Sequence, residues 1–264
     1  MNFQKYKTIK FQRRLKVLEV TLNRPEKLNA VDEEMHAELA CLFSDVAEDV
    51  DSEIIVLSGA GRAFSAGGDI EWMQRMIDVP DSFEKTAREG KQIINSLLDC
   101  QKPVIAKING HATGLGATMA LFCDVIFANE SAKIGDPHVC VGLVAGDGGA
   151  VIWPQLIGYA RAKEYLMTGD LIPAPEAARI GLINHAVATN ELDAKVAEFA
   201  DRLAAGASQS IRWTKASVNI GLKQLVQSVM EASMAYESIS SRTADHQEAV
   251  NAFREKRAAQ FRGC

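Results

Sequence analysis

Short apolar runs separated by glycine-rich turns dominate the first two thirds of the chain. Val17 to Leu22 predicts a strand that ends before Pro25, because proline cannot continue a strand ladder. From Asp32 onward apolar residues recur with helical spacing, and Asp32 is the expected N-cap. Three further short apolar runs occur at residues 54–57, 104–108 and 125–127. Continuous apolar runs predict strands that are covered on both faces, so the pattern indicates an α/β fold.

After Val187 the pattern becomes helical throughout. The expected helices span residues 192–203, 210–219, 222–240 and 244–260. One stretch is crowded with large apolar side chains, namely Met230, Met234, Tyr236 and Ile239. A stripe this wide predicts either intrachain core, which periodicity alone favours, or a surface that packs outside its own hairpin. We therefore divide the chain into a core at residues 1–189 and a C-terminal helical region at residues 190–264.

Composition narrows the classes of partner. The chain has 264 residues and 47% hydrophobic residues, which is enough for a substantial core. Its net charge of −5 argues against a nucleic-acid-binding domain, since those carry a basic excess. The longest uncharged apolar run, Ile108 to Cys123, contains glycines and is shorter than the roughly 18–20 residues of a membrane span. We expect neither a nucleic-acid nor a membrane partner.

The N-terminus and the cysteines bear on location. Six basic residues and no acid occur in the first 16 positions, but no apolar stretch follows as a secretory signal requires. Alternation through Tyr6, Ile9 and Phe11 favours an exposed first strand, and a transit role stays open. Five cysteines without a Cys-x-x-Cys pair predict neither a disulfide framework nor a thiolate zinc site. The expected compartment is therefore the reducing cytoplasm. The histidines are too scattered along the sequence to form a local metal motif, so we expect no metal site.

Two glycine-rich segments, residues 62–70 and 108–118, each follow a predicted strand and precede a helix. Glycine there lets the backbone approach a ligand closely, and free N–H groups at a helix start favour anions. Two such pockets could share one oxyanion. Neither segment has a dinucleotide or P-loop motif, and the chain has no Gly-x-Ser-x-Gly elbow. Taken singly, each segment is better explained as a tight turn, since glycine turns after strands are common.

A third glycine-rich segment, residues 135–149, contains His138 and Asp147. Imidazole and carboxylate are both suited to proton transfer. The alternatives are structural: Asp147 would cap a helix beginning near Ala150, and His138 would bond to turn backbone.

Six blocks of sequence together resemble the enoyl-CoA hydratase/isomerase (crotonase) superfamily. They begin at Leu22, Ala63, Lys107, Ala145, Leu166 and Ala252 and cover nearly the whole chain in order. The resemblance implies a spiral of ββα units followed by a helical trimerisation region, in homotrimers or in hexamers made of two trimers. It also implies an acyl-CoA substrate, with coenzyme A as part of that substrate and no separate cofactor.

The same resemblance implies particular site residues. An oxyanion hole for the thioester oxygen maps onto the backbone amides of Ala66 and Leu115, with Gly114 keeping the second turn open. Lys256 would reach the phosphates of coenzyme A in its own or a neighbouring subunit. The path of the CoA nucleotide maps onto Leu28, Ala30, Gly68, Asp69 and Ile70.

Two departures from the family pattern bear on mechanism. Typical hydratases carry two glutamates where this chain has Thr118 and His138, so paired-carboxylate hydration does not carry over. His138 and Asp147, with Trp153-Pro154, resemble instead a side branch, the 6-oxocamphor hydrolase type of β-diketone hydrolase. Because the CoA-handling blocks are intact, we expect first an acyl-CoA hydratase or isomerase with His138 and Asp147 as acid–base residues. The alternatives are a C–C hydrolase of β-diketones and a catalytically silent acyl-CoA-binding oligomer.

Overall fold

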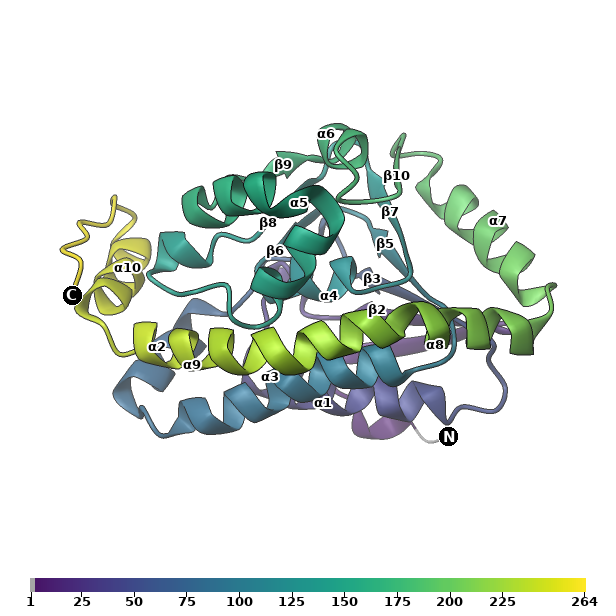
Figure 1. Cartoon of the computed structure of the whole chain (residues 1–264), viewed down its shortest axis with the longest axis horizontal. Helices are drawn as coiled ribbons and strands as arrows, with labels where there is room; N and C mark the ends of the chain where they lie inside the picture. The colour runs from purple at the N-terminus through teal and green to yellow at the C-terminus, as the bar shows by residue number, and fades with distance from the viewer. Residues whose placement is uncertain (1–2) are drawn as a thin grey trace.

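The computed structural model describes residues 3–264 and contains two β-sheets surrounded by helices (Figure 1). The larger sheet has the order β1 (Ile9–Arg14), β2 (Val17–Leu22), β3 (Ile54–Gly59), β5 (Val104–Ile108), β7 (Val125–Asn129) and β10 (His185–Val187). The smaller sheet has the order β4 (Ala63–Ser65), β6 (His111–Thr113), β8 (Lys133–Gly135) and β9 (Ile172–Pro173). The pair β1/β2 of the larger sheet and the pair β8/β9 of the smaller sheet are antiparallel. All other pairs are parallel.

Ten α-helices are described. They are α1 (Glu33–Ala47), α2 (Ile70–Asp78), α3 (Ser82–Asp99), α4 (Leu115–Leu121), α5 (Gly149–Thr168), α6 (Ala174–Arg179), α7 (Leu192–Ala204), α8 (Ser208–Leu225), α9 (Glu231–Ser240) and α10 (Ala244–Glu255). A π-helical segment, η4 (Val226–Met230), joins α8 to α9, and 3₁₀ turns occur at η1 (Phe3–Lys5), η2 (Pro25–Lys27) and η3 (His138–Val141).

The strands follow a repeated pattern. The pairs β3 and β4, β5 and β6, and β7 and β8 each give one strand to the larger sheet and the next to the smaller, and a helix follows. This is the spiral of ββα units that the resemblance implies, so the expected fold is confirmed. The repeat brings the ends of β4, β6 and β8 side by side, and the loops after them carry the glycine-rich segments.

The hydrophobic pattern is realised in the core. Asp32 caps α1 by accepting a hydrogen bond from the Met35 amide, as the sequence predicts. The strand β3 is buried over residues 54–58, which agrees with its continuous apolar sequence. A main cluster fills the space between the sheets, α1, α3 and α5, and a smaller cluster lies between the larger sheet and α7.

The C-terminal helices differ in detail from the expectation. The helix expected at 222–240 is divided by η4, and the one expected at 244–260 ends at Glu255. The second break occurs because Lys256 adopts a left-handed conformation, with φ 55°, which no α-helix continues. The intrachain reading of the apolar stretch is confirmed for its first half, and the outward-packing reading stays a prediction for its second half. Met230 and Met234 are buried in the main cluster, whereas Tyr236 and Ile239 are 63% and 65% exposed.

The basic N-terminal residues belong to the fold. Ile9 is buried at the start of β1, and the strand pairs with β2. Lys5, Lys7 and Arg13 form ion pairs with Asp45, Glu34 and Asp49, respectively. Across residues 3–264, no helix has both the length and the apolar character needed to cross a membrane.

Candidate active site

The two glycine-rich loops meet in the structure. Gly67 follows β4 with φ 82°, and Gly114 follows β6 with φ 53°, a region that favours glycine. A side chain at Gly67 would come within 3.1 Å of the Thr113 carbonyl oxygen and 3.6 Å of the Gly114 Cα. Close approach of two backbones is therefore the reason for glycine here.

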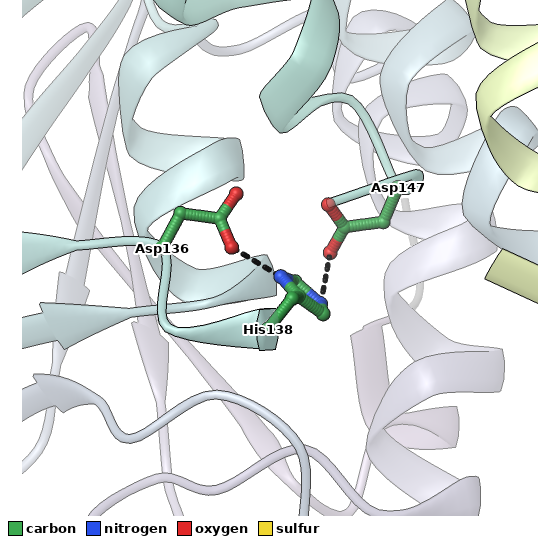
Figure 2. A group of neighbouring side chains, drawn as sticks. All are labelled: Asp136, His138 and Asp147. Carbon is green, nitrogen blue, oxygen red and sulfur yellow. Dashed lines mark hydrogen bonds and ion pairs between the residues drawn. The ribbon is translucent and has the colours of Figure 1, made fainter. Parts of the chain in front are cut away.

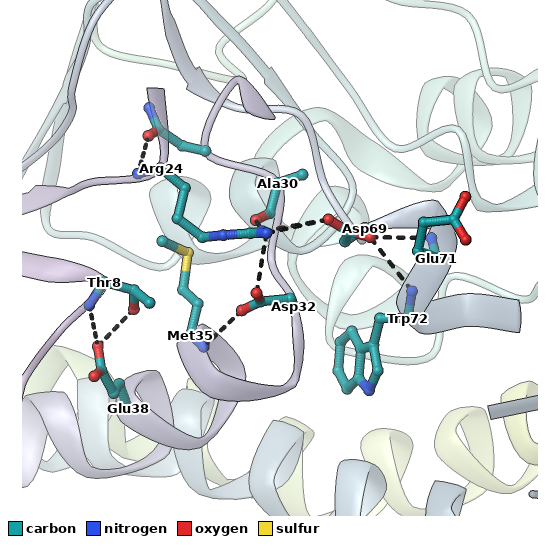
Figure 3. Close-up of polar contacts among 10 residues, drawn as sticks. Thr8, Arg24, Ala30, Asp32, Met35, Glu38, Asp69, Glu71 and Trp72 are labelled. Carbon is teal, nitrogen blue, oxygen red and sulfur yellow. Dashed lines mark hydrogen bonds and ion pairs between the residues drawn. The ribbon is translucent and has the colours of Figure 1, made fainter. Parts of the chain in front are cut away.

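Arg24 fixes the first of these loops (Figure 3). Its guanidinium group donates to the Ala30 carbonyl and lies 3.0 Å from Asp32 and 3.3 Å from Asp69. The Asp69 carboxylate also accepts from two backbone amides at the start of α2. Asp69 lines the groove as the resemblance implies, but its carboxylate holds the loop and caps the helix.

The backbone amides correct one expectation. The Ala66 N–H, expected in the oxyanion hole, donates to the Leu28 carbonyl at 3.0 Å and is therefore occupied. Val31 bonds to the carbonyl of Gly67 and the N–H of Asp69, which turns the intervening Gly68 N–H away from Val31. The Gly68 amide has no hydrogen-bond partner among residues 3–264.

The second expected amide, that of Leu115, has no such partner among the described residues. Leu115 is the first residue of α4, where helix geometry leaves the N–H without an intrahelical acceptor. In the described chain this N–H also has no other partner. Leu115 and Gly68 line the same small pocket. Two unoccupied amide donors at one pocket, one of them at a helix N-terminus, form a site suited to a negatively charged oxygen.

His138 lies between two aspartates, as Figure 2 shows. Its Nδ1 forms a short hydrogen bond with Asp136 Oδ1, and its Nε2 lies 3.6 Å from Asp147 Oδ2. The partner of the ring is thus a carboxylate and not the turn backbone. Gly148 occupies the N-cap position of α5, but the Asp147 carboxylate accepts from the Gly149 N–H at the start of that helix, so the capping alternative holds in part. Asp147 also accepts a hydrogen bond from the Thr118 hydroxyl at 3.2 Å.

Sequence reasoning missed two members of this cluster. Asp136 is buried, and its Oδ2 packs where a side chain on Gly149 would otherwise lie. Glu237 is buried on α9, and its Oε2 has no partner in the described part of the chain. A signal for Glu237 existed, because it follows Met230 and Met234 at helical spacing and is the acid on that apolar stripe. Asp136 offered only its proximity to His138.

The electrostatics of the cluster favour a charged imidazole. Burial opposes protonation of His138, but the charges of Asp136 and Asp147 outweigh it and hold the pKa of His138 well above its ordinary value. Burial raises the pKa of Asp147, and the opposing effects of His138 and Thr118 do not cancel that rise. Burial also raises the pKa of Glu237 to about 8, so this side chain is neutral at pH 7. The cluster thus holds an imidazolium beside a carboxyl group of raised pKa.

Two connected cavities carry the site residues. An outer groove of about 530 Å³ is lined by Lys27 and Phe253 and by the sequence-predicted Leu28, Ala30, Ala66, Gly68, Asp69, Ile70 and Gly114. An inner pocket of about 60 Å³ is lined by Leu115, Asp147 and Glu237, by apolar side chains, and by the polar side chains of His36, Thr86, Ser241 and His246. Gly68 and His138 line both cavities. Thr118 and Lys256 line neither, although Thr118 touches the site through Asp147.

The same three side chains could in principle ligate a metal ion. Ligand atoms of Asp136, His138 and Asp147 lie within 4.8 Å of one another. However, Nδ1 is already hydrogen-bonded to Asp136, so the ring would offer an ion only Nε2, which lies 3.6 Å from Asp147 Oδ2. The arrangement therefore fits proton transfer better than metal binding.

Comparison with known proteins identifies the family of the chain. Residues 12–264 match the family model described as enoyl-CoA hydratase/isomerase. The chain is 33% identical to a crotonyl-CoA hydratase of Syntrophomonas wolfei, over 97% of this chain and 98% of that one. It resembles the crystal structure of an enoyl-CoA hydratase/isomerase from Mycobacterium paratuberculosis, with 36% identity, a TM-score of 0.89, and coverage of 92% and 97%.

A β-diketone hydrolase is also a structural neighbour. The enzyme from the cyanobacterium Anabaena, bound to (S)-3-oxocyclohexyl acetic acid, is 29% identical with a TM-score of 0.85. The two structures overlap over 91% of this chain and 96% of that one. Because the family model and the hydratase relative both cover nearly the entire chain, this protein belongs to the enoyl-CoA hydratase/isomerase family.

Proposed function

We propose that this enzyme hydrates or isomerises a short enoyl-CoA thioester. The observation that carries the proposal is a single pocket that contains two unoccupied amides, those of Gly68 and Leu115, together with the side chains of His138 and Asp147. The outer groove shares Gly68 and His138 with this pocket, and we assign the CoA part of the ligand to it. The inner pocket is small and largely apolar, which suits a short acyl group.

In the proposed reaction the thioester oxygen accepts hydrogen bonds from both amides. Asp147 removes a proton, either from a substrate carbon or from a water molecule that adds to the β-carbon. Loss of the proton from carbon, or addition of the deprotonated water to the β-carbon, moves an electron pair onto the thioester oxygen. The two amides stabilise the resulting enolate. One such donor contributes about 3–4 kcal/mol to the transition state in a well-studied hydrolase. A proton then returns to carbon from the His138 imidazolium or from Asp147, which completes hydration or isomerisation.

Asp136 and Thr118 would act as positioning residues. Asp136 holds Nδ1 of His138 and leaves Nε2 facing the pocket. Thr118 holds one oxygen of Asp147 and leaves the other facing His138. In this proposal the side chains of His138 and Asp147, held by these contacts, carry out the acid–base steps that two glutamates carry out in typical hydratases.

A panel of short and medium enoyl-CoA esters tests this proposal. Wild-type protein should turn over at least one ester, and H138A and D147N should lose about 100-fold or more of kcat. The matched control is H111A, because His111 is exposed at the start of β6 and lines neither cavity. Unchanged turnover in both site variants would remove these residues from the chemistry.

A second candidate, C–C hydrolysis of a β-diketone, is favoured by the similarity to the Anabaena enzyme. Water would add to one carbonyl carbon, the adjacent C–C bond would break, and the released enolate would take a proton on carbon. His138 and Asp147 would serve this reaction as the acid–base pair. Cleavage of a cyclic diketone without CoA would favour this candidate over the first. Binding of acyl-CoA without any turnover would favour the catalytically silent alternative.

Assembly and location form a further part of the proposal. Exposed apolar side chains on the C-terminal helices, among them Trp213, Val218, Tyr236 and Ile239, support a homotrimer or hexamer built through residues 190–264. Sedimentation measurements test this. All five cysteines are free, which supports a reducing, cytoplasmic location.

A further inference from the structure

A second histidine lies in the wall of the inner pocket, and the proposed reaction does not use it. His36 is 3% exposed on the inner face of α1, among apolar core residues. Its Nδ1 lies 2.8 Å from Glu89 Oε2 on α3, and its ring lies against Trp72 with centroids 5.1 Å apart. Two neighbours therefore fix the orientation of the ring.

The other nitrogen of this ring is available to a ligand. Because a carboxylate accepts, Nδ1 carries the proton in the contact with Glu89. Nε2 has no hydrogen bond within residues 3–264, and His36 lines the inner pocket. The same pocket is lined by apolar side chains, among them Trp72, Met73, Met76 and Phe83, and also by the polar side chains of Thr86, Ser241, His246 and Glu237. Nε2 is thus one of a few polar atoms in a largely apolar pocket.

A purely structural role accounts poorly for this histidine. Burial of a polar group is unfavourable unless it is hydrogen-bonded, and half of the ring's hydrogen-bonding capacity is unused. Glu89 already has a cation nearby, because Lys85 Nζ lies 3.7 Å from its carboxylate. Lys85 also pairs with Glu33 and so already connects α3 to α1. An apolar residue at position 36 would leave that connection intact.

We propose that Nε2 of His36 binds a hydroxyl or carbonyl oxygen on the acyl group, remote from the thioester. The substrate class is then a short acyl-CoA that carries a hydrogen-bonding oxygen at its far end. The thioester part of this assignment rests on the proposed function, and the oxygen at the far end rests on His36. Imidazole serves this purpose because its Nε2 accepts from a hydroxyl when neutral and donates to a carbonyl when charged. A preorganised ring of this kind discriminates strongly against an analogue that lacks the oxygen.

Binding of saturated thioesters tests the inference without turnover. Butanoyl-CoA, pentanoyl-CoA and hexanoyl-CoA are compared by calorimetry with their terminal-hydroxyl analogues. Wild-type protein should bind one hydroxyl analogue at least about tenfold more tightly than its parent. H36L should abolish that preference, and H36Q, whose amide can replace Nε2, should keep part of it. E89Q is the control variant: it removes the charge of the carboxylate that contacts Nδ1 and keeps His36 itself.

The outcomes separate the two proposals. A wild-type protein that binds the plain chains as tightly as the hydroxyl analogues overturns the role of His36. So does an H36L variant that weakens both members of a pair equally, since that result marks a structural role. Retained preference without turnover of any enoyl-CoA would contradict the proposed function and support the inference. Failure to bind any thioester would contradict both.

Discussion

Nε2 of His138 lies 3.6 Å from Oδ2 of Asp147, a distance too long for a direct hydrogen bond. The opposite ring nitrogen is in close contact with Asp136. The histidine is thus held firmly on one side and open on the other, toward the inner pocket. We infer that protons move on the Asp147 side, and that Asp136 orients the ring and sets its charge.

Replacement of Asp136 by asparagine should separate orientation from charge. The amide oxygen can still accept from Nδ1, but the negative charge that raises the pKa of His138 is lost. We expect kcat to fall about 10–100-fold with little change in KM, and the alkaline limb of the pH profile to move to lower pH. D193N, on the exposed face of α7, is the matched control. An alkaline limb that does not move would exclude Asp136 as the group that tunes His138.

The pH dependence of kcat should be bell-shaped. The pKa of Asp147 is raised by burial, so activity falls on acidification above the usual range of an aspartate. The pKa of His138 is held well above its ordinary value, so the imidazolium persists at neutral pH and activity falls only on further alkalinisation. Rates measured across pH with a saturating enoyl-CoA test this. A profile that rises with pH through the ordinary histidine range would show that neutral His138 is the active form.

The Leu115 amide can be removed with little damage to the helix. Leu115 is the first residue of α4, a position that tolerates proline, and proline has no N–H. L115P should lose about 100–1,000-fold in kcat, whereas L115A, which keeps the N–H, should lose far less. Thermal unfolding of both variants reports on folding. Equal losses in the two variants would assign the effect to the side chain and not to an oxyanion donor.

Stability should depend on the ionisation of Glu237. Its pKa is 4.5 in the unfolded chain and about 8 in the folded protein, so the folded state retains a proton that the unfolded state releases. This contribution is complete below pH 4.5 and declines as pH rises to about 8, by at most about 1.4 kcal/mol per pH unit. Urea denaturation at several pH values should show that E237Q loses this decline. E231Q, which alters an exposed acid on the same helix, should keep it; identical pH slopes for wild type and E237Q would refute the assignment.

Much of the fold follows from local sequence. The strands at 17–22 and 104–108 and the helix capped by Asp32 form where the pattern places them, because burial on both faces and capping leave clear signatures. The ends of the C-terminal helices do not follow from the pattern. The π-helical break at Val226–Met230 and the left-handed Lys256 are features of backbone geometry that the apolar pattern does not encode.

The candidate site is less predictable, since backbone atoms supply part of it. Sequence places Leu115 correctly at a helix start but cannot show that the Ala66 amide is occupied by Leu28 and that the Gly68 amide is not. Asp136 and Glu237 join His138 only through tertiary packing, since Glu237 comes from the C-terminal helical region. Charge and burial, and hence the pKa of each group, exist only once these segments meet.

The central claim is that this site transfers protons at carbon beside a thioester whose oxygen is held by the Gly68 and Leu115 amides. Its most direct test is incorporation of deuterium from D₂O at the α-carbon of butanoyl-CoA, followed by NMR. The account predicts that wild-type protein incorporates deuterium and that D147N does so at least about 100-fold more slowly. Binding of butanoyl-CoA by the wild-type protein without any deuterium at the α-carbon would contradict it.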